Sequence, residues 1–280
     1  MKRTTTGILV LGMAVTAPAR HQEIPEAEKQ AIIQTALDYM DGAHSGDPAR
    51  IERSAHVEMN KVSIASLPTG RQGLNRAGYS RLLELVRANA VPLAPGERNI
   101  RVDVFTAKEG LACVLAQSAR FYDYLMMAKI DGQWKYINIL WRPNTAEKPN
   151  PPEADRDAIR QAALDYLDGF YSGDAERVRR GVHPELYKVR PHRLPQTGRT
   201  LLDKVGAELL AEAAGARMGL VDEDKRNIEI NMLDINQDIA MVEAISRMYY
   251  DYLQLAKING RWQIVNVLWV MNPAAPRPTP

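Results

Sequence analysis

The chain has 280 residues, of which 45% are hydrophobic and 25% are charged, and its formal net charge is +2. This composition is typical of a globular protein, and the length suffices for two ordinary domains. Lys and Arg are interleaved with Asp and Glu along the chain, whereas a nucleic-acid-binding surface normally shows clustered basic residues. We therefore expect no nucleic acid among the partners.

The N-terminus has the pattern of a signal peptide. Lys2 and Arg3 give it a basic start, and residues 8–15 form a short apolar run. Residues 17–19 (Ala-Pro-Ala) then offer a small-x-small cleavage site. The run is too short to span a bilayer, so no membrane anchor is expected. We expect residues 1–19 to be removed on export and the mature protein to be periplasmic or secreted.

The single cysteine is predicted to be a core residue. Cys113 lies in the apolar run of residues 111–115, and the matching position in the second half of the chain is Met241. One cysteine cannot form an internal disulfide, which leaves the fold to be held by its core.

The two halves of the chain are copies of one unit. Residues 31–62 match residues 158–189, with more than half of the positions identical, and residues 122–141 match residues 250–269. The register shifts by one residue between the two blocks. A period this long indicates duplication of a whole domain.

The repeat defines the expected domain boundaries. We expect a first domain at residues 27–142 and a second at residues 156–273. Between them lies a proline-rich linker, residues 143–155, which should be extended and semi-rigid. A proline-rich tail at residues 274–280 is expected to be disordered.

Each copy begins with predicted helices. Apolar residues recur at helical spacing between residues 32 and 43, and Asp47 is placed to cap a second helix that should run to about Ala55. A third helix is expected at residues 75–89, and its counterpart in the second half at residues 201–214.

Strands follow the helices. Residues 100–104 and 228–232 alternate between apolar and polar side chains. A long hairpin comes next, with Asp131-Gly132 at its turn in one copy and Asn259-Gly260 in the other, and both dipeptides suit a two-residue type I′ turn. The unit is therefore α+β, with about three N-terminal helices packed on a curved antiparallel sheet of four to six strands.

The order of short motifs resembles a known family. Each copy carries Asp-Tyr-x-Asp-Gly, Ser-Gly-Asp, His-x-Glu-(Leu or Met) and a closing Asp/Asn-Gly-x-Trp. This order is similar to that of the bacterial "putative lumazine-binding" branch of the nuclear transport factor 2-like superfamily. The resemblance covers nearly the whole mature chain, twice.

The resemblance implies two tandem cone-shaped domains, each with an apolar cavity capped by helices. The superfamily includes isomerases, dehydratases and cyclases as well as members that only bind or scaffold, so the fold alone does not assign an activity. Such domains commonly dimerise through their sheets. We therefore expect either an intrachain pseudo-dimer of the two domains or a homodimer.

Four positions kept in both copies are candidates for chemistry. His56 and His183 could act as general acids or bases, or could cap a helix end. Glu58 and Glu185, two residues further on, could orient the imidazoles or bind ligand. Alternatively, they could pair with Lys61 and Lys188 at the surface.

Asp123 and Asp251 are the sharpest candidates. Each alternates with apolar residues along a predicted strand and therefore shares an apolar face. Burial raises the pKa of an uncompensated carboxyl group, which would suit proton transfer inside a cone. A position near a strand end, in reach of solvent or an Arg, is the alternative.

The first helix of each copy carries acidic residues and a tyrosine. Asp38 and Asp41 lie on one face near the C-terminal end, where carboxylates oppose the helix dipole, so specific partners are expected. Arg50 or Arg53, and Arg177 or Arg180 for the matching Asp165 and Asp168, are the obvious ones. Tyr39 and Tyr166 could present their hydroxyl groups to a ligand or pack on the sheet.

Tryptophans recur on the last hairpin of each copy. Trp141 and Trp269 could form an aromatic wall for a flat ligand, together with Trp134 and Trp262, or could pack helix on sheet.

No phosphate-binding loop, nucleophile elbow or clustered metal-ligand set occurs in the sequence. The five histidines are scattered, so neither a metal nor another cofactor is expected.

Three functions follow from these observations. The leading one is an exported, cofactor-free protein that binds a small apolar or aromatic ligand in a cavity of each domain. The first alternative is an isomerase, dehydratase or cyclase that moves protons with the Asp and His candidates. The second is a protein-interaction scaffold.

The two copies differ at positions that could rim the cavities. Ala43 becomes Phe170 and His44 becomes Tyr171 in the second half. If these residues line the mouths, only one copy is active or each prefers a different ligand.

Overall fold

The computed structural model describes residues 24–145, 148 and 150–275. The expected signal peptide lies outside these residues, as do parts of the linker and most of the expected tail. Within these residues, each half of the chain forms three α-helices, a short 3-10 helix and six strands.

The first half runs from helix to sheet in the following order: α1 (Glu26–Ser45), α2 (Pro48–Ser54), β1 (Ala55–Ser66), β2 (Gln72–Gly78), α3 (Tyr79–Arg87), β3 (Arg101–Lys108), β4 (Leu111–Gln117), β5 (Phe121–Ile130) and β6 (Gln133–Pro143).

The second half repeats this order: α4 (Glu153–Ser172), α5 (Ala175–Gly181), β7 (Val182–Arg193), β8 (Thr200–Val205), α6 (Ala207–Gly215), β9 (Glu229–Asn236), β10 (Ile239–Ile245), β11 (Tyr249–Ile258) and β12 (Arg261–Met271).

Short polar signals set the helix boundaries. Gly46 has φ of 66° and ends α1, a conformation that a residue without Cβ adopts at little cost. Asp47 then caps α2, because its Oδ1 accepts a hydrogen bond from the amide of Ala49 at 3.0 Å. Asp174 caps α5 in the same way through the amide of Arg177. The predicted end of the second helix near Ala55 is confirmed.

Each half builds one six-stranded sheet with the same strand order, β2-β1-β6-β5-β4-β3 and β8-β7-β12-β11-β10-β9. All neighbours pair antiparallel except β1 with β6 and β7 with β12, which are parallel. Bulges interrupt the β5–β6 and β11–β12 ladders, and such bulges bend a sheet. The predicted α+β class with two tandem units is confirmed, although the sheets are mixed and not wholly antiparallel.

The predicted turns of the long hairpins are confirmed. Asp131 and Gly132 have φ of 49° and 87°, and Asn259 and Gly260 have φ of 50° and 79°. Two successive positive φ values are the requirement of a type I′ turn.

The predicted start of the third helix is wrong in both copies. Residues 72–78 form β2 and residues 200–205 form β8, so α3 begins only at Tyr79 and α6 only at Ala207. The backbone of these residues pairs with β1 and β7, and this long-range pairing overrides their local helical pattern.

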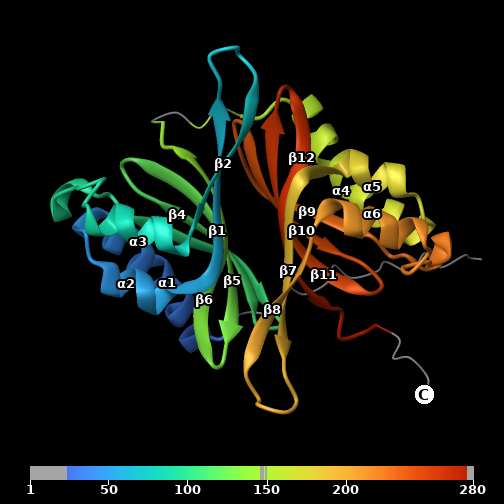
Figure 1. Cartoon of the computed structure of the whole chain (residues 1–280), viewed down its shortest axis with the longest axis horizontal. Helices are drawn as coiled ribbons and strands as arrows, with labels where there is room; N and C mark the ends of the chain where they lie inside the picture. Colours follow the sequence, from blue (N-terminus) through green and yellow to red (C-terminus); the bar gives the residue numbers. More distant parts are fainter. Residues whose placement is uncertain (1–23, 146–147, 149, 276–280) are drawn as a thin grey trace, which may run out of the picture.

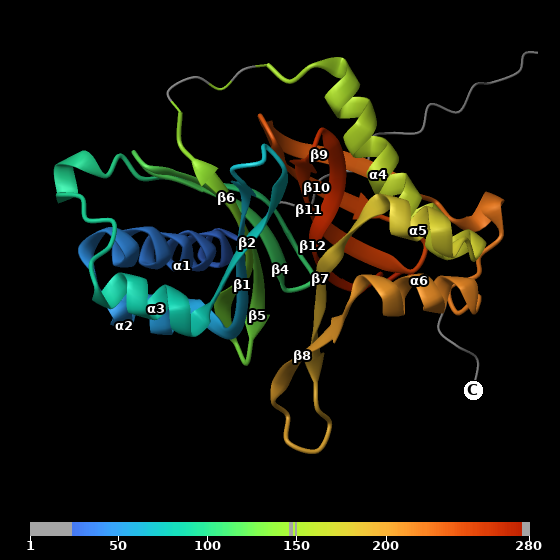
Figure 2. The same ribbon diagram turned by 45° about the horizontal axis from the view of Figure 1, so that its top comes forward.

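The two sheets face each other at the centre of the molecule, with helices α1 to α3 on one outer side and α4 to α6 on the other (Figure 1). Figure 2 shows the same four layers from another side. Between the sheets lies one apolar cluster drawn from both halves, which includes Tyr124, Cys113, Tyr252 and Leu268. The prediction that Cys113 is buried is confirmed.

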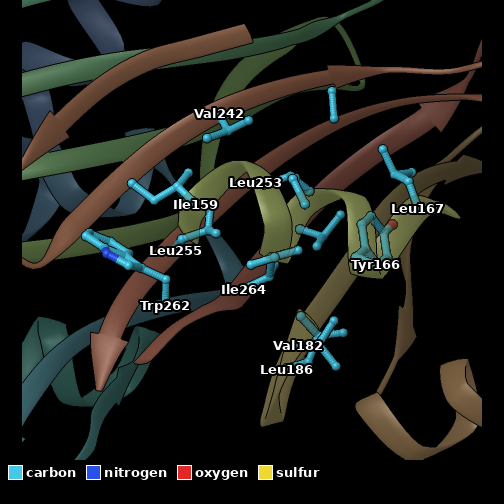
Figure 3. Packing of buried hydrophobic residues seen from close by; sticks show 14 of the residues in the cluster. Ile159, Tyr166, Leu167, Val182, Leu186, Val242, Leu253, Leu255, Trp262 and Ile264 are labelled. Carbon is cyan, nitrogen blue, oxygen red and sulfur yellow. The ribbon is translucent and has the colours of Figure 1, made fainter. Parts of the chain in front are cut away.

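Each half also has a core of its own, between its helices and the face of its sheet that points away from the other half. We call this helix-covered face the inner face of the sheet. Figure 3 shows the core of the second half, where Tyr166 and Leu167 of α4 lie among side chains such as Leu253 and Ile264 of the sheet. The candidate site lies in this inner layer.

The β1–β2 and β7–β8 hairpins extend in opposite directions past the edges of the sheets (Figure 1). Each hairpin contacts a turn of the other half. The amide of Gln72 donates to Asn259 Oδ1 at 2.8 Å, and the amide of Thr200 donates to Asp131 Oδ1 at 2.9 Å. The Asp and Asn of the type I′ turns therefore also join the two halves.

Candidate functional site

A buried carboxylate lies in the core between the helices and the sheet of each half, the part of the fold that we call the cone. Asp123 on β5 and Asp251 on β11 are both 0% exposed. The hydroxyl of Tyr39 donates to Asp123 Oδ2, and the hydroxyl of Tyr166 donates to Asp251 Oδ1 at 2.7 Å. The prediction that these Asp side chains share an apolar inner face is confirmed, and the two tyrosines of the first helices reach them.

A lysine completes each cluster. Lys61 Nζ lies 3.0 Å from Asp123 Oδ2, and Lys188 Nζ lies 3.1 Å from Asp251 Oδ1. Each ammonium also donates to the tyrosine hydroxyl of its cluster. The expectation that these lysines could pair with Glu58 and Glu185 is therefore wrong. We call Tyr39–Lys61–Asp123 and Tyr166–Lys188–Asp251 the two inner clusters.

Burial shapes the electrostatics of the inner clusters. Desolvation lowers the pKa of Lys61 and of Lys188, and the neighbouring carboxylate opposes this effect. Desolvation also raises the pKa of Tyr39 well above its usual value, and the charge of Asp123 adds to the rise. The tyrosines are therefore neutral hydrogen-bond donors near neutral pH.

Aromatic rings surround the ammonium groups. Lys61 Nζ lies 4.6 Å from the ring centroid of Trp141 and 5.7 Å from that of Phe121. Lys188 Nζ lies 4.3 Å from the ring centroid of Trp269. These are cation–π distances. Trp141 and Trp269 therefore lie beside the inner clusters, and their role as an aromatic wall for a ligand stays a prediction.

One oxygen of each carboxylate lacks a partner. Asp123 Oδ1 and Asp251 Oδ2 are buried and accept no hydrogen bond from any residue that the structure describes. Buried polar atoms are normally satisfied, so an unpartnered oxygen that recurs in both copies calls for an explanation. It marks the place where the cluster can accept one more hydrogen bond.

The other carboxylates of the first helices form structural ion pairs. Asp38 accepts from both Arg50 and Arg53, and Asp41 accepts from Arg50 and Arg98. The second half repeats this pattern, which confirms the predicted arginine partners. The equivalent pairs are Asp165 with Arg177 and Arg180, and Asp168 with Arg177 and Arg226.

The histidine candidates lie apart from the inner clusters. His56 and His183 are on β1 and β7, and each ring accepts a hydrogen bond at Nδ1 from the amide two residues on, at 3.1 Å. Neither ring caps a helix, because α2 and α5 end before them. The described contacts do not bring an imidazole to Asp123 or Asp251.

The glutamate candidates lie between the two halves. Glu58 pairs with Lys204 at 2.8 Å, and Glu185 pairs with Arg76 at 3.1 Å. These four side chains come from β1, β2, β7 and β8. The glutamates therefore link one sheet to the other, and they do not contact the inner clusters.

Buried core side chains surround each inner cluster. The apolar cavity expected in each domain stays a prediction. A groove of about 540 Å³ lies on the outside by the start of α1, lined by residues such as Glu28, Asp38, Arg53 and Trp134. Within the described residues, no group of three or more His, Cys, Asp or Glu side chains could hold a metal ion. No helix in residues 24–145, 148 and 150–275 is long and apolar enough to cross a bilayer.

Comparison with known protein families identifies the family to which the chain belongs. The family described as "putative lumazine-binding" matches residues 27–142 and again residues 154–270. The chain therefore belongs to this family and contains two tandem copies of its domain. Among curated proteins, no match was found.

Solved structures resemble one half of the chain. An NTF2-like protein of unknown function from Silicibacter pomeroyi DSS-3 is 16% identical, with a TM-score of 0.37, and the match covers 44% of this chain and 100% of that one. An NTF2-like protein of unknown function from Shewanella baltica OS155 is 14% identical, with a TM-score of 0.34, and the match covers 45% and 99%.

Proposed function

We propose that this chain is an exported protein that binds a small, flat heterocyclic molecule at an inner cluster. The observation that carries the proposal is the unpartnered oxygen of a fully buried carboxylate, next to a lysine ammonium that lies over a tryptophan ring, in both copies. Binding sites of this kind are mostly apolar, with a few convergent polar groups that fix the orientation of the ligand.

The carboxylate and the ammonium of the inner cluster select a particular ligand edge. A carboxylate oxygen accepts a hydrogen bond from N–H, and an ammonium donates to C=O. Asp123 and Lys61 are adjacent, so together they match the neighbouring N–H and C=O of a lactam or cyclic imide. A flat ring bearing that edge would stack on Trp141.

The family description supports this chemistry. Lumazine is a pteridine with two ring carbonyl groups and ring N–H groups, so it carries the lactam edge and the flat ring together. The sequence suggested an apolar cavity, whereas the inner cluster adds a charged pair to the aromatic wall. The ligand that fits is therefore aromatic with a polar edge, and not lipid-like.

The ligand would approach past the aromatic residues that cover the ammonium. The Lys61 side chain is 11% exposed, and Phe121 and Trp141 are half-buried. The interior is closely packed, so we propose that these two rings turn aside when the ligand enters. Side-chain rearrangement of this size is common on binding.

Titration calorimetry with lumazine tests the proposal. We expect saturable binding to the wild-type chain and at least a tenfold weaker affinity for the Asp123→Asn and Lys61→Met variants. Lys204→Ala, which removes an ion pair between the two halves, is the matched control and should bind as the wild type does. Equal affinity in all four proteins, or no binding to any of them, would overturn the proposal.

The acid–base enzyme receives less support. That reading requires an Asp and a His to converge, and the described contacts of His56 are with the amide of Glu58. Proton transfer within one inner cluster would rest on its Asp, Lys and Tyr alone.

Export is the second part of the proposal. It is supported by the basic start, the apolar run and the Ala-Pro-Ala site of residues 17–19. Expression of the full chain with fractionation and N-terminal sequencing tests it. A mature N-terminus near Arg20 in the exported fraction is expected, and an intact N-terminus in the cytoplasmic fraction would contradict it.

A further inference from the structure

The two inner clusters are alike, but the surroundings of their tryptophans differ. Ser63 follows Lys61 by two residues on β1, and Arg190 occupies the equivalent place after Lys188 on β7. Side chains two apart on a strand share one face, so residue 63 or residue 190 lies beside the lysine of its cluster.

Arg190 covers the tryptophan of the second half. Its guanidinium carbon lies 5.0 Å from the ring centroid of Trp269, over which Lys188 also lies. In the first half, Lys61 is the one cation over Trp141 among the residues that the structure describes. A flat ligand that stacks on the tryptophan would meet the lysine ammonium in both halves, and in the second half it would also have to displace Arg190.

A local network holds Arg190 in this position. Its Nε and Nη2 atoms each lie 3.0 Å from Asp203 Oδ2 on the paired strand β8. His192 Nδ1 also lies 3.0 Å from this oxygen. The first half carries Asn75 opposite Ser63 and Ala65 in place of His192, so it has no equivalent network.

A second substitution fills the same end of the second cone. Phe170 replaces Ala43, and its ring lies 6.2 Å from that of Tyr249, which in turn packs edge-on against Trp269 at 5.2 Å. Ala43 occupies the equivalent position in the first half, where the counterpart of Gly219, the residue under the Phe170 ring, is Val91. The Nε1 atom of Trp269 is buried and unpartnered among the described residues, which fits a covered ring.

We infer that the first cone is the ligand-binding one and that Arg190 and Phe170 close the second. This inference rests on the proposed function, and it identifies two pairs of equivalent positions, 63 with 190 and 43 with 170, as the determinants of which copy binds. The second inner cluster is then the inherited counterpart of the binding cluster, and the chain binds one ligand.

Native mass spectrometry of the full chain with lumazine measures the number of ligands directly. We expect one per wild-type chain, none for Ser63→Arg and two for the double variant Arg190→Ser/Phe170→Ala. Lys61→Met should abolish binding and Lys188→Met should leave it unchanged. Circular dichroism and thermal melting of each variant establish whether it is folded. If Ser63→Arg does not fold, the Lys61→Met variant serves as the non-binding first cone in its place.

The outcomes separate the two proposals. Two ligands on the wild-type chain, or one that is lost in Lys188→Met and kept in Lys61→Met, would overturn the assignment to the first cone and leave the proposed function standing. A count that stays at one in the folded double variant would refute closure by Arg190 and Phe170. No ligand on any protein would overturn the proposed function and this inference with it.

Discussion

Lys61 Nζ lies 3.0 Å from Asp123 Oδ2 inside the first cone, with the carboxylate fully buried. A charged pair in an apolar layer has a large desolvation cost, and a hydrophobic pair of the same volume would often stabilise the fold as well. The same pair recurs in the second half at 3.1 Å. Its presence in both copies is more readily explained by a binding role inherited from the ancestral unit than by stability.

Removing one member of the Lys61–Asp123 pair should destabilise the fold more than removing both. Asp123→Asn leaves the Lys61 ammonium buried without its counter-ion, so we expect a loss of about 3–5 kcal/mol in the free energy of unfolding. The double variant Asp123→Leu/Lys61→Met removes both charges and should recover most of that loss. Urea unfolding of the three proteins measures this. A double variant no more stable than Asp123→Asn would contradict the account.

Asn266 should be important for holding the two sheets together. Its side chain accepts from Asn60 Nδ2 at 2.9 Å and donates to Gln254 Oε1 at 2.7 Å, all in the buried layer between the halves. Asn266→Ala leaves two buried polar groups without a partner, and each such group costs about 1–3 kcal/mol.

Asn138 is the matched control for Asn266. It occupies the equivalent position in the first half, where its Nδ2 meets only Met126 Sδ at 3.7 Å and its Oδ1 is unpartnered among the described residues. Asn138→Leu should therefore leave the urea midpoint unchanged or raise it. A similar loss of stability in both variants would refute the role assigned to Asn266.

Stability should fall as the solution becomes mildly acidic. Desolvation lowers the pKa of His56 and of His183 in the folded state, below the value of about 6.5 of an unfolded chain. The unfolded state therefore binds more protons, so the stabilisation is complete above about pH 6.5 and is lost as the pH falls through the folded-state pKa values. A protonated Nδ1 also cannot accept the amide hydrogen bond.

Unfolding in urea at pH 7.5 and pH 5.0 tests this sign. The wild type should lose more stability between the two pH values than the double variant His56→Gln/His183→Gln does. An equal or larger loss of stability in the variant would contradict this prediction, because groups other than His56 and His183 would then dominate the pH dependence of stability.

Gly181 should not tolerate a side chain. A Cβ at this position would lie 2.6 Å from the carbonyl oxygen of Ala162 and 2.8 Å from the amide nitrogen of Tyr166, both on the backbone of α4. Gly181→Ala should therefore force α5 from α4 and cost about 1–3 kcal/mol. Gly73→Ala, where no atom lies within 4 Å, is the control and should melt within a few degrees of the wild type.

Local signals explain what could be predicted from the sequence. The cap at Asp47, the Asn-Gly and Asp-Gly turns and the alternation around Asp123 each act over a few residues, and the structure confirms all three. Strands β2 and β8 escaped prediction because they depend on pairing with β1 and β7, which the local sequence does not encode.

The inner clusters were predicted only in part. Asp123 and Tyr39 were found because both recur in the two copies, and Lys61 recurs as well. Its role was missed because the nearest acidic residue in sequence is Glu58, whereas its partner lies 62 residues away on β5. The rule that residues two apart on a strand share a face would have placed Lys61 with buried Met59.

Crystallography of the chain soaked with lumazine tests the central claim most directly. We predict density for one flat ring against Trp141, with a ring N–H within hydrogen-bond distance of Asp123 Oδ1 and a carbonyl oxygen near Lys61 Nζ. Density only in the outer groove beside Trp134 would contradict the account. So would an Asp123 Oδ1 that still accepts no hydrogen bond at saturating lumazine.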